Sequence, residues 1–425
     1  MYATFVNSDR NVTDEGADSE RDSERDDSES ERSEDGEERR AEESHERSGR
    51  FVETRHNPEV FKIKQFNQGN QEMAPFYNGV TLEERMAEVR SSIYYIRQNW
   101  GKRHQFMEEL KHLLQDGDGL EFEEETTRAH CVQLFSSDRD WLTQEKAQSA
   151  ELNYEAVKLY TSKDGHKKIY RIANYIFRQK GDVSPEIIRC IVFLVELINI
   201  DLFNYCLKFP GKSDFQGTVY RGMGVTDEDL DAFKAMREEP INKRNVAVPL
   251  GLFASSSSIK VAKKFIRQTL KGSSLHPLML KIHVISLKQE YVNIYRDRFP
   301  GAELTTICAV DIHEISRFPK EKEVLLRGPF MVILNFYEDE NTRLLGQPCN
   351  VVEAVMLNAN RDHISTSHLG DLDARARDIF GAMVSVTRNE YAREYCKKNG
   401  LVDDAHEYTK AFEDSITKLN AVLEK

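Results

Sequence analysis

Residues 318 to 328 read FPKEKEVLLRG, in which two glutamates one residue apart, Glu321 and Glu323, lead into an apolar run. The run favours a strand, and the residues before it favour a loop. The two carboxylates are either solvated surface charges or a pair that acts in one reaction. In extended backbone, residues i and i+2 point the same way about 7 Å apart, which predicts that both carboxylates face one site.

Short segments rich in β-branched and aromatic residues surround this stretch. Between residues 217 and 338 they read GTVYRGM, VPLGLFASSS, PLMLKIHVI, ELTTICAVDI and EVLLRGPFMVILNFYE, with Gly, Pro and polar residues between them. This composition predicts strands. Helical spacing precedes them, in residues 81–115 and 150–209, and follows them from about residue 348 to the end. Helices, then strands, then helices predict an α+β fold rather than an α/β fold.

The first helical pattern, in residues 81–100, has apolar residues spaced alternately by four and three. Thr81 and Glu84 form a capping box that predicts its start. With the following segment HQFMEELKHLLQ it predicts a helical hairpin packed on the core. The alternative is a short coiled-coil contact with a partner through residues 82–100.

The longest apolar run, IIRCIVFLVELINIDLF, covers residues 187–203 and contains Arg189, Glu196 and Asp201. A bilayer span needs about 20 predominantly apolar residues, so the run predicts a buried core helix and no membrane span. Ser184 and Pro185 predict where this helix begins.

An acidic segment, residues 15–50, contains 16 acidic and 7 basic residues, and it carries most of the net charge of −13. It lacks the apolar surface that would offset the entropy of ordering, which predicts disorder. The rest of the chain is close to neutral. A basic footprint for nucleic acid is absent from the sequence, so no nucleic-acid partner is expected.

The start of the sequence, MYATFVNSDRN, has neither the basic nor the apolar region of a secretory signal, which predicts a cytoplasmic or nuclear protein. The six cysteines are scattered without a CxxC pair. This pattern predicts reduced thiols rather than a disulfide framework or a zinc site.

Three short motifs occur in order in the strand-rich part. VYRGM contains Arg221 and Gly222, FASSSSIKVAKKF contains Ser255 to Ser258, and EKEVLL contains Glu321 and Glu323. Taken singly, the first motif favours a turn, the second a strand followed by a helix that Ser258 caps, and the third surface charge. Taken together, arginine, then Ser-x-Ser, then Glu-x-Glu before an apolar strand resembles the Arg–Ser–Glu class of mono-ADP-ribosyltransferases. IYRIANYIFRQ, SIKVAKKF and ISRFPKEKEVLL resemble its eukaryotic arginine-specific branch.

The resemblance covers residues 151 to 338. It implies a split β-sandwich with a helical N-terminal subdomain, NAD bound in a cleft, no metal, and transfer of ADP-ribose to a protein that carries an accessible arginine. The expected division of the chain is a disordered tail and linker (1–75), a helical extension (76–150), the catalytic domain (151–344) and a C-terminal helical extension (345–425).

The resemblance also implies roles for individual residues. Glu323 stabilises the oxocarbenium-like charge that develops when the bond to nicotinamide breaks, and it holds a ribose hydroxyl. Ser256 is the serine that aims Glu323, although the SSSS run leaves Ser255 and Ser257 as alternatives, and Ser258 is expected to contact NAD.

Arg221 binds pyrophosphate oxygens with its planar fork, and the Gly222 backbone approaches the nicotinamide amide. Glu321 pairs with the acceptor guanidinium, orients it and takes its proton. Two alternatives to arginine transfer remain at this point: an NAD glycohydrolase with water as acceptor, and a catalytically silent interaction protein on the same fold.

Overall fold

The computed structural model describes residues 64–66, 82–116, 125–136, 138–165, 184–247, 252–302, 304–327, 330–361 and 369–424. Arg50–Lys425 cluster into one unit. Three predictions lie wholly or partly outside the described residues: the disordered segment 15–50, the capping residue Thr81, and the helical pattern of residues 150–209 where it covers residues 166–183.

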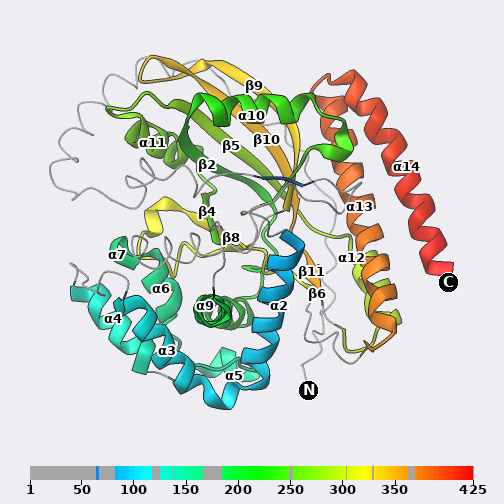
Figure 1. Cartoon of the computed structure of the whole chain (residues 1–425). Helices are drawn as coiled ribbons and strands as arrows, with labels where there is room; N and C mark the ends of the chain where they lie inside the picture. The colour runs from blue at the N-terminus through cyan, green and yellow to red at the C-terminus, as the bar shows by residue number, and fades with distance from the viewer. Residues whose placement is uncertain are drawn as a thin grey trace, which may run out of the picture. The chain divides into compact units, whose positions relative to one another are not determined.

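Helices up to residue 208 form a lobe around one central helix, α9 (Pro185–Lys208) (Figure 1). The others are α2 (Leu82–Gln98), η3 (Trp100–Lys102), α3 (Arg103–Asp116), α4 (Glu125–Ser136), α5 (Gln144–Ser149), α6 (Glu155–Thr161) and α7 (Lys163–Gly165). α2 and α3 confirm the predicted hairpin. Val89 and Ile96 of α2 are buried in the core cluster that contains α9, and Ile93 and Trp100 pack against it. From Val89 onward the described part of the apolar stripe is therefore covered within the chain.

α9 begins where the sequence predicts. Ser184 Oγ accepts a hydrogen bond from Ile187 N at 3.3 Å, and Pro185 occupies the first turn. By length and composition the helix could cross a membrane, but 89% of its most apolar window is buried inside the protein. Its Asp201 is also buried and ion-pairs with Arg139 at 2.5 Å. The prediction of a core helix is confirmed.

The described strands form a nine-stranded mixed sheet with the order β1-β3-β9-β10-β5-β2-β4-β8-β7, and β6 and β11 form a separate pair. Their bounds are β1 (Lys64–Phe66), β2 (Gly217–Val225), β3 (Asn245–Ala247), β4 (Leu252–Ser256), β5 (His276–Ile285), β6 (Leu304–Thr305), β7 (Ala309–Asp311), β8 (Glu323–Arg327), β9 (Phe330–Leu344), β10 (Gln347–Leu357) and β11 (Asn360–Arg361). β5 and β10 pair in parallel, and the neighbouring pairs β9·β10 and β2·β5 are antiparallel. The predicted α+β class is confirmed.

The sheet divides between β2 and β4, where the described pairing is a single residue pair, Tyr220 opposite Ser256. The two parts nevertheless share one core, because Val324 and Leu326 of β8 lie in the same buried cluster as residues of β2, β5, β9 and β10. Leu325, between them, faces the other way and lies in the core of the helical lobe. This alternation is expected of a strand covered on both faces, and the arrangement is the predicted split β-sandwich with a helical subdomain.

One prediction about the C-terminal region is wrong, because the segment that starts at Pro348 is a strand and not a helix. β10 lies in the middle of the sheet, between β9 and β5, and is buried along most of its length. A strand covered on both faces has an apolar run without alternation, which periodicity cannot distinguish from a buried helix. The predicted boundary at residues 344 and 345 therefore cuts through the β9·β10 hairpin.

The rest of the predicted C-terminal helical region contains two helices, α13 (Leu372–Lys398) and α14 (Val402–Glu424), with Gly400 between them at a φ of 70°. The remaining helices are α10 (Asp227–Glu238), η5 (Ile241–Lys243), α11 (Ile259–Leu270), α12 (Gln289–Arg298) and η6 (Pro319–Glu321). α13 and α14 share a buried cluster with β9 and β10. Arg244 also donates two hydrogen bonds to Asp404 of α14, both at 3.0 Å. The C-terminal helices are therefore bound to the sheet by a shared core and a buried ion pair.

β1 lies in the region predicted to be a disordered tail and linker. Lys64–Phe66 pairs antiparallel with Asn245–Ala247 of β3 and forms the edge of the sheet. The region expected to be a linker thus contributes one short strand to the described sheet. A strand this short, with two polar residues, carries no periodic signal that the sequence could reveal.

The six cysteines are free, as their scattered positions predict, and five of them are buried. Burial raises the pKa of Cys131 to about 12 and that of Cys349 to about 11. At neutral pH such thiols stay protonated and pack as small apolar side chains.

Glu353 of β10 is a carboxylate that is 5% exposed, and three side chains hold it in its charged form. The partners are His283 Nε2 at 2.9 Å, Lys281 Nζ at 3.2 Å and Tyr337 OH at 2.9 Å. Burial acts to raise the pKa of Glu353, but these hydrogen bonds and positive charges outweigh burial and lower the pKa to about 2.

Folding stability should therefore depend on Glu353 in acid. A carboxyl whose pKa is lower in the folded than in the unfolded state stabilises the fold above its unfolded pKa of about 4.3, and this contribution is lost as the pH falls toward 2. Urea unfolding of the wild type and of Glu353→Gln should show a stability difference that shrinks between about pH 5 and about pH 3. A difference that stays constant over this range contradicts the assignment.

Candidate active site

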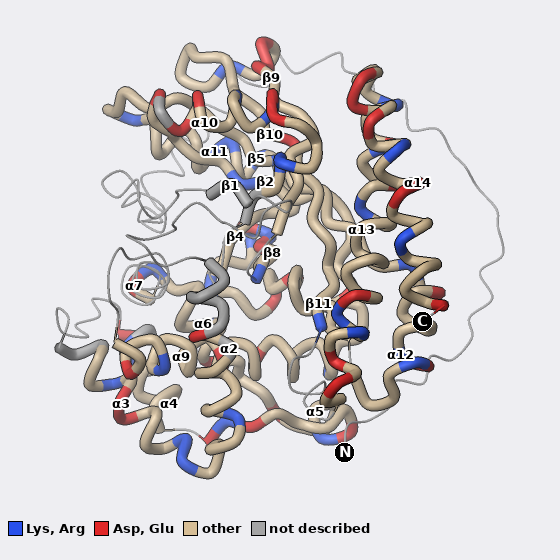
Figure 2. Tube along the Cα trace, turned by 45° about the vertical axis from the view of Figure 1, so that its right-hand side comes forward, with Lys and Arg blue, Asp and Glu red and all other residues tan. Residues whose placement is uncertain are grey.

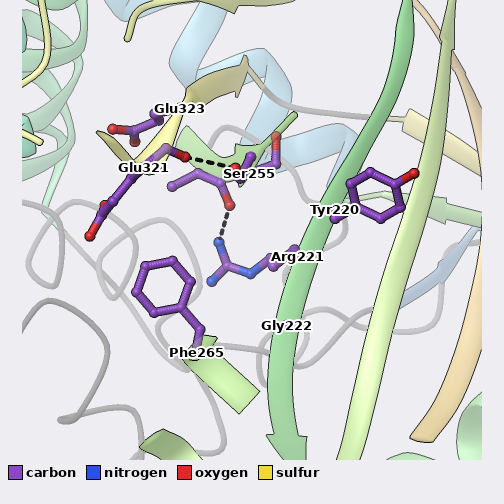
Figure 3. A pocket seen from close by; sticks show the side chains of 9 residues that line it. Tyr220, Arg221, Gly222, Ser255, Phe265, Glu321 and Glu323 are labelled. Atoms are coloured by element: carbon purple, nitrogen blue, oxygen red, sulfur yellow. Dashed lines mark hydrogen bonds between the residues drawn. The ribbon is translucent and has the colours of Figure 1, made fainter. Parts of the chain in front are cut away.

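A hollow opens at the split between β2 and β4 (Figure 3). Its lining consists of Tyr220, Arg221, Gly222, Ala254, Ser255, Ser256, Phe265, Glu321 and Glu323. The structure thus brings together the three motifs that the sequence singled out, although about a hundred residues separate the first from the last. The hollow exists at this place because the two parts of the sheet separate here, which leaves the ends of β4 and β8 facing β2.

Glu323 is the first residue of β8 and is 2% exposed. Its Cα pairs with that of Ser256 on β4. Ser316 Oγ donates a hydrogen bond to Glu323 Oε2 at 3.2 Å, and the same hydroxyl accepts one from Phe318 N at 3.1 Å. A buried carboxylate held by a strand and by a neighbouring hydroxyl has little freedom to reorient, which suits a group that stabilises charge at a fixed point.

Glu321 does not lie in extended backbone, and this corrects the prediction from the Glu-x-Glu spacing. It ends the 3-10 turn η6, and Lys322 after it has the left-handed conformation, with a φ of 46° and a ψ of 50°. The two glutamates therefore approach the hollow from a turn and from a strand, rather than from the same side of one strand. Glu321 is half-buried and Lys322 is exposed, so this turn forms the rim of the hollow.

The serine run at the end of β4 holds this turn. Ser256 Oγ donates to Glu321 O at 2.7 Å and accepts from Ser258 N at 3.0 Å, and Ser257 N donates to Lys322 O at 3.0 Å. A hydroxyl has one proton, and in Ser256 it goes to the Glu321 carbonyl instead of the Glu323 carboxylate that the resemblance implied.

Two other serines of the run have different surroundings. Ser255 Oγ donates to Val324 O at 2.7 Å, so this hydroxyl also fastens β4 to β8. Ser258 occupies the N-cap position of α11, but within this helix its side chain forms no capping hydrogen bond, which corrects the predicted cap. Its main-chain carbonyl accepts from Ala262 N at 3.3 Å, and the residue lies outside the lining of the hollow.

Arg221 extends from β2 toward the turn that carries the glutamates (Figure 3). It is 4% exposed, its Nη1 donates to Ala254 O at 2.6 Å, and its guanidinium carbon lies 4.3 Å from the centre of the Phe253 ring. These contacts join β2 to β4 across the split. They fix the plane of a guanidinium that has five N–H donors, the geometry that pyrophosphate oxygens favour.

Gly222 has a packing reason to be glycine. A Cβ at this position would lie 2.0 Å from Ala262 O and 2.7 Å from Ile266 Cγ1, both on α11. Contacts this short would push α11 away from β2. The glycine therefore sets how closely α11, one wall of the hollow, approaches the sheet, in addition to the role in nicotinamide binding that the resemblance implies.

Sequence reasoning missed three residues of the site. Tyr220 and Phe265 line the hollow, and Ser316 contacts Glu323. Phe265 could have been found, because it lies on the buried face of a strongly amphipathic helix that follows the serine motif. Ser316 has no signal in the sequence, since its contact depends on the path of the loop between β7 and β8.

The same loop is anchored to the helical lobe. Arg317 N donates to Thr161 Oγ1 of α6 at 3.0 Å, and the Arg317 guanidinium contacts the His130 ring of α4. Helices that precede the sheet thus position the segment that carries Glu321 and Glu323. Among the described residues, no group of three His, Cys, Asp or Glu side chains is arranged to hold a metal ion.

Ser316→Ala should lower the maximal rate of any reaction that uses Glu323 by about tenfold, because hydrogen bonds to charged groups contribute about 1.5–3 kcal/mol. The KM should change little, since Ser316 lies outside the lining. Steady-state kinetics of the wild type and of Ser316→Ala measures both values, and equal melting temperatures of the two proteins show that the fold is unchanged. Ser257→Ala is the matched control, because its main-chain hydrogen bond to Lys322 remains. Equal rates for both variants would exclude the positioning role of Ser316.

No protein-family model matches the sequence, and no curated protein matches it. Solved structures do match: the Vis toxin, an ADP-ribosyltransferase from Vibrio splendidus, is 18% identical with a TM-score of 0.32, over 56% of this chain and 88% of that chain. ADP-ribosyltransferase HopU1 of Pseudomonas syringae pv. Tomato DC3000 is 12% identical with a TM-score of 0.33, over 59% and 97%. The eucaryotic mono-ADP-ribosyltransferase ART2.2 is 15% identical with a TM-score of 0.27, over 72% and 94%. These ADP-ribosyltransferases are proteins to which the chain is similar in structure, at low sequence identity.

Proposed function

We propose that this protein transfers ADP-ribose from NAD to arginine side chains of proteins and releases nicotinamide. One observation carries the proposal: Arg221, Ser256, Glu321 and Glu323, from motifs far apart in the chain, line a single hollow at the split of the sheet. The residues present fit NAD as a substrate. A fixed guanidinium suits its pyrophosphate, and a buried carboxylate suits the positive charge that develops on its ribose.

In the first half of the reaction the bond between ribose C1′ and the nicotinamide nitrogen breaks, and nicotinamide leaves with the electron pair. Glu323 supplies the opposing negative charge at the reacting carbon. Ser316 Oγ orients that carboxylate through its hydrogen bond to Glu323 Oε2. Arg221 binds the pyrophosphate, so that the ribose stays beside Glu323.

In the second half a guanidine nitrogen of the acceptor forms the new bond to C1′ and loses one proton. A protonated guanidinium is a poor nucleophile, because its pKa is above about 12. Glu321, on the rim turn that Ser256 fastens, pairs with the guanidinium, orients it and takes the proton. Water that reaches the same carbon would give free ADP-ribose instead.

Incubation of the purified protein with NAD labelled on the adenylate tests the proposal. The acceptors are agmatine, which is a small guanidine, and an arginine peptide, each compared with the corresponding lysine compound. Label on the guanidines alone supports arginine transfer. Free ADP-ribose without labelled acceptor indicates a glycohydrolase, and intact NAD with every acceptor indicates a catalytically silent protein.

A further inference from the structure

α11 has one exposed face that is basic. Its members are Lys260, Lys264, Arg267 and Lys271, the last of which directly follows the helix, and all four are exposed. Spacings of four, three and four residues place them within about 60° of one another around the helix axis. The opposite face, which contains Ala262, Phe265, Ile266 and Leu270, is buried against the sheet. The four cations therefore form a stripe that points away from the core.

The four cations differ from other lysines on the described helices in their ion pairs. The helix sequence IKVAKKFIRQTL contains no Asp or Glu, and within the part of the chain that the structure describes none of the four cations forms an ion pair. Exposed lysines on other helices do: Lys234 pairs with Asp231 at 3.5 Å and Lys111 with Glu108 at 3.9 Å. Figure 2 shows α11 beside the sheet, and the stripe is opposite in sign to the chain's net charge of −13.

The helix that carries the stripe forms a wall of the candidate active site. Phe265, from the buried face of α11, lines the hollow. At the start of the helix the basic surface continues onto the rim turn, because Ser257 N donates to the main-chain carbonyl of exposed Lys322. Ile259, which is 42% exposed, lies next to Lys260 and adds an apolar contact point. We define the α11 basic surface as Lys260, Lys264, Arg267, Lys271, Lys322 and Ile259.

We propose that the α11 basic surface docks an acidic segment of the protein substrate, next to the arginine that is modified. The inference rests on the proposed function. Glu321 presents a negative charge at the rim for the acceptor guanidinium, and positive charges flank it along the turn and α11. The complementary substrate is an arginine flanked by Asp and Glu residues. The exposed Ile259, and the burial of the aromatic Phe265 on the opposite face of α11, favour a protein segment over stacked nucleic-acid bases.

The test compares two peptides with one arginine each, one with Asp and Glu around it and one with Asn and Gln in their place, together with agmatine. The variant is Lys260→Gln with Lys264→Gln in the full chain. The matched control is Lys410→Gln with Lys418→Gln, which removes the same charge from two exposed positions on α14. α14 lies on the side of the sheet away from α11 in both views (Figures 1 and 2). Transfer kinetics at saturating NAD and fluorescence anisotropy of the labelled peptides are measured at low and at physiological salt.

In the wild type the acidic peptide should have the lower KM, and salt should reduce this preference. The α11 variant should raise the KM and the Kd for the acidic peptide roughly fivefold to tenfold at low salt, with agmatine kinetics unchanged. Docking on α11 is overturned if the preference for the acidic peptide survives in the α11 variant, or if it falls equally in the α14 control. Transfer to agmatine in that case leaves the proposed function intact.

If no acceptor is labelled, the proposed function fails, and the anisotropy measurement alone then tests the docking surface. Loss of acidic-peptide binding only in the α11 variant supports the surface. Duplex DNA that binds as tightly as the acidic peptide, and is lost in the same variant, overturns the protein partner.

Discussion

Glu323→Gln should lower both transfer to arginine and hydrolysis of NAD by at least about a hundredfold, the usual effect of removing one electrostatic stabiliser of a transition state. Both reactions pass through the same developing positive charge on the ribose, so a group that opposes this charge affects them equally. The substitution keeps the size of the side chain, and its amide oxygen can still accept the hydrogen bond from Ser316. The loss of charge is therefore the main change. Rates of labelled nicotinamide release and of acceptor labelling measure the two reactions.

A second buried glutamate supplies the control for this substitution. Glu353→Gln also neutralises a carboxylate in the sheet, but Glu353 lies outside the lining of the hollow. At neutral pH, below the melting temperature of either variant, Glu353→Gln should keep its activity while Glu323→Gln loses it. Comparable losses in both would mean that activity follows the stability of the sheet. Full hydrolysis by Glu323→Gln would remove Glu323 from the reaction.

Local patterns predicted those parts of the fold in which one face of an element is buried and the other is not. The apolar stripe of α2 is of this kind. The start of α9 was predicted by a different local signal, the capping residue Ser184 followed by Pro185. The strand β10 was predicted wrongly because both of its faces are covered, so its sequence has no alternation. Its strand conformation depends on pairing with β9 and with β5, the latter about 70 residues away. The sequence also did not predict the edge strand β1, because its pairing with β3 is a long-range contact.

The candidate site shows the same division. The order of the arginine, serine and glutamate motifs led to residues that the fold does bring together. The conformation of the rim turn did not follow from the sequence, because a left-handed residue is commonly glycine or asparagine and here it is Lys322. This one residue turns Glu321 away from the direction that a continuous strand would give it. The Glu321 carbonyl accepts a hydrogen bond from Ser256 Oγ. This contact links the serine and glutamate motifs, and because it involves a main-chain group no side-chain pattern in the sequence predicts it.

That turn makes the two glutamates separable by mutation. The main chain of Glu321 is fastened by Ser256, and the 3-10 turn before it is closed by its own hydrogen bond, Glu321 N to Phe318 O at 2.9 Å. A change confined to the Glu321 side chain therefore leaves the path of the loop, and with it Glu323 and Ser316, in place. Glu407 of α14 is an exposed glutamate outside the lining of the hollow, and Glu407→Gln is the control for the loss of one negative charge.

Glu321→Gln should lower the rate of transfer to arginine by about a hundredfold or more, while slow hydrolysis of NAD persists. In the proposed reaction Glu323 still opposes the charge on the ribose. The carboxylate proposed to pair with the guanidinium and to accept its proton is gone, and a neutral amide does neither well. The ratio of labelled agmatine to free ADP-ribose, measured in one reaction, isolates this effect from any loss of folded protein, and Glu407→Gln should leave the ratio unchanged. Normal labelling of arginine by Glu321→Gln would show that another group receives the proton. Loss of hydrolysis together with transfer would show instead that Glu321 acts on the ribose, beside Glu323, in the first half of the reaction.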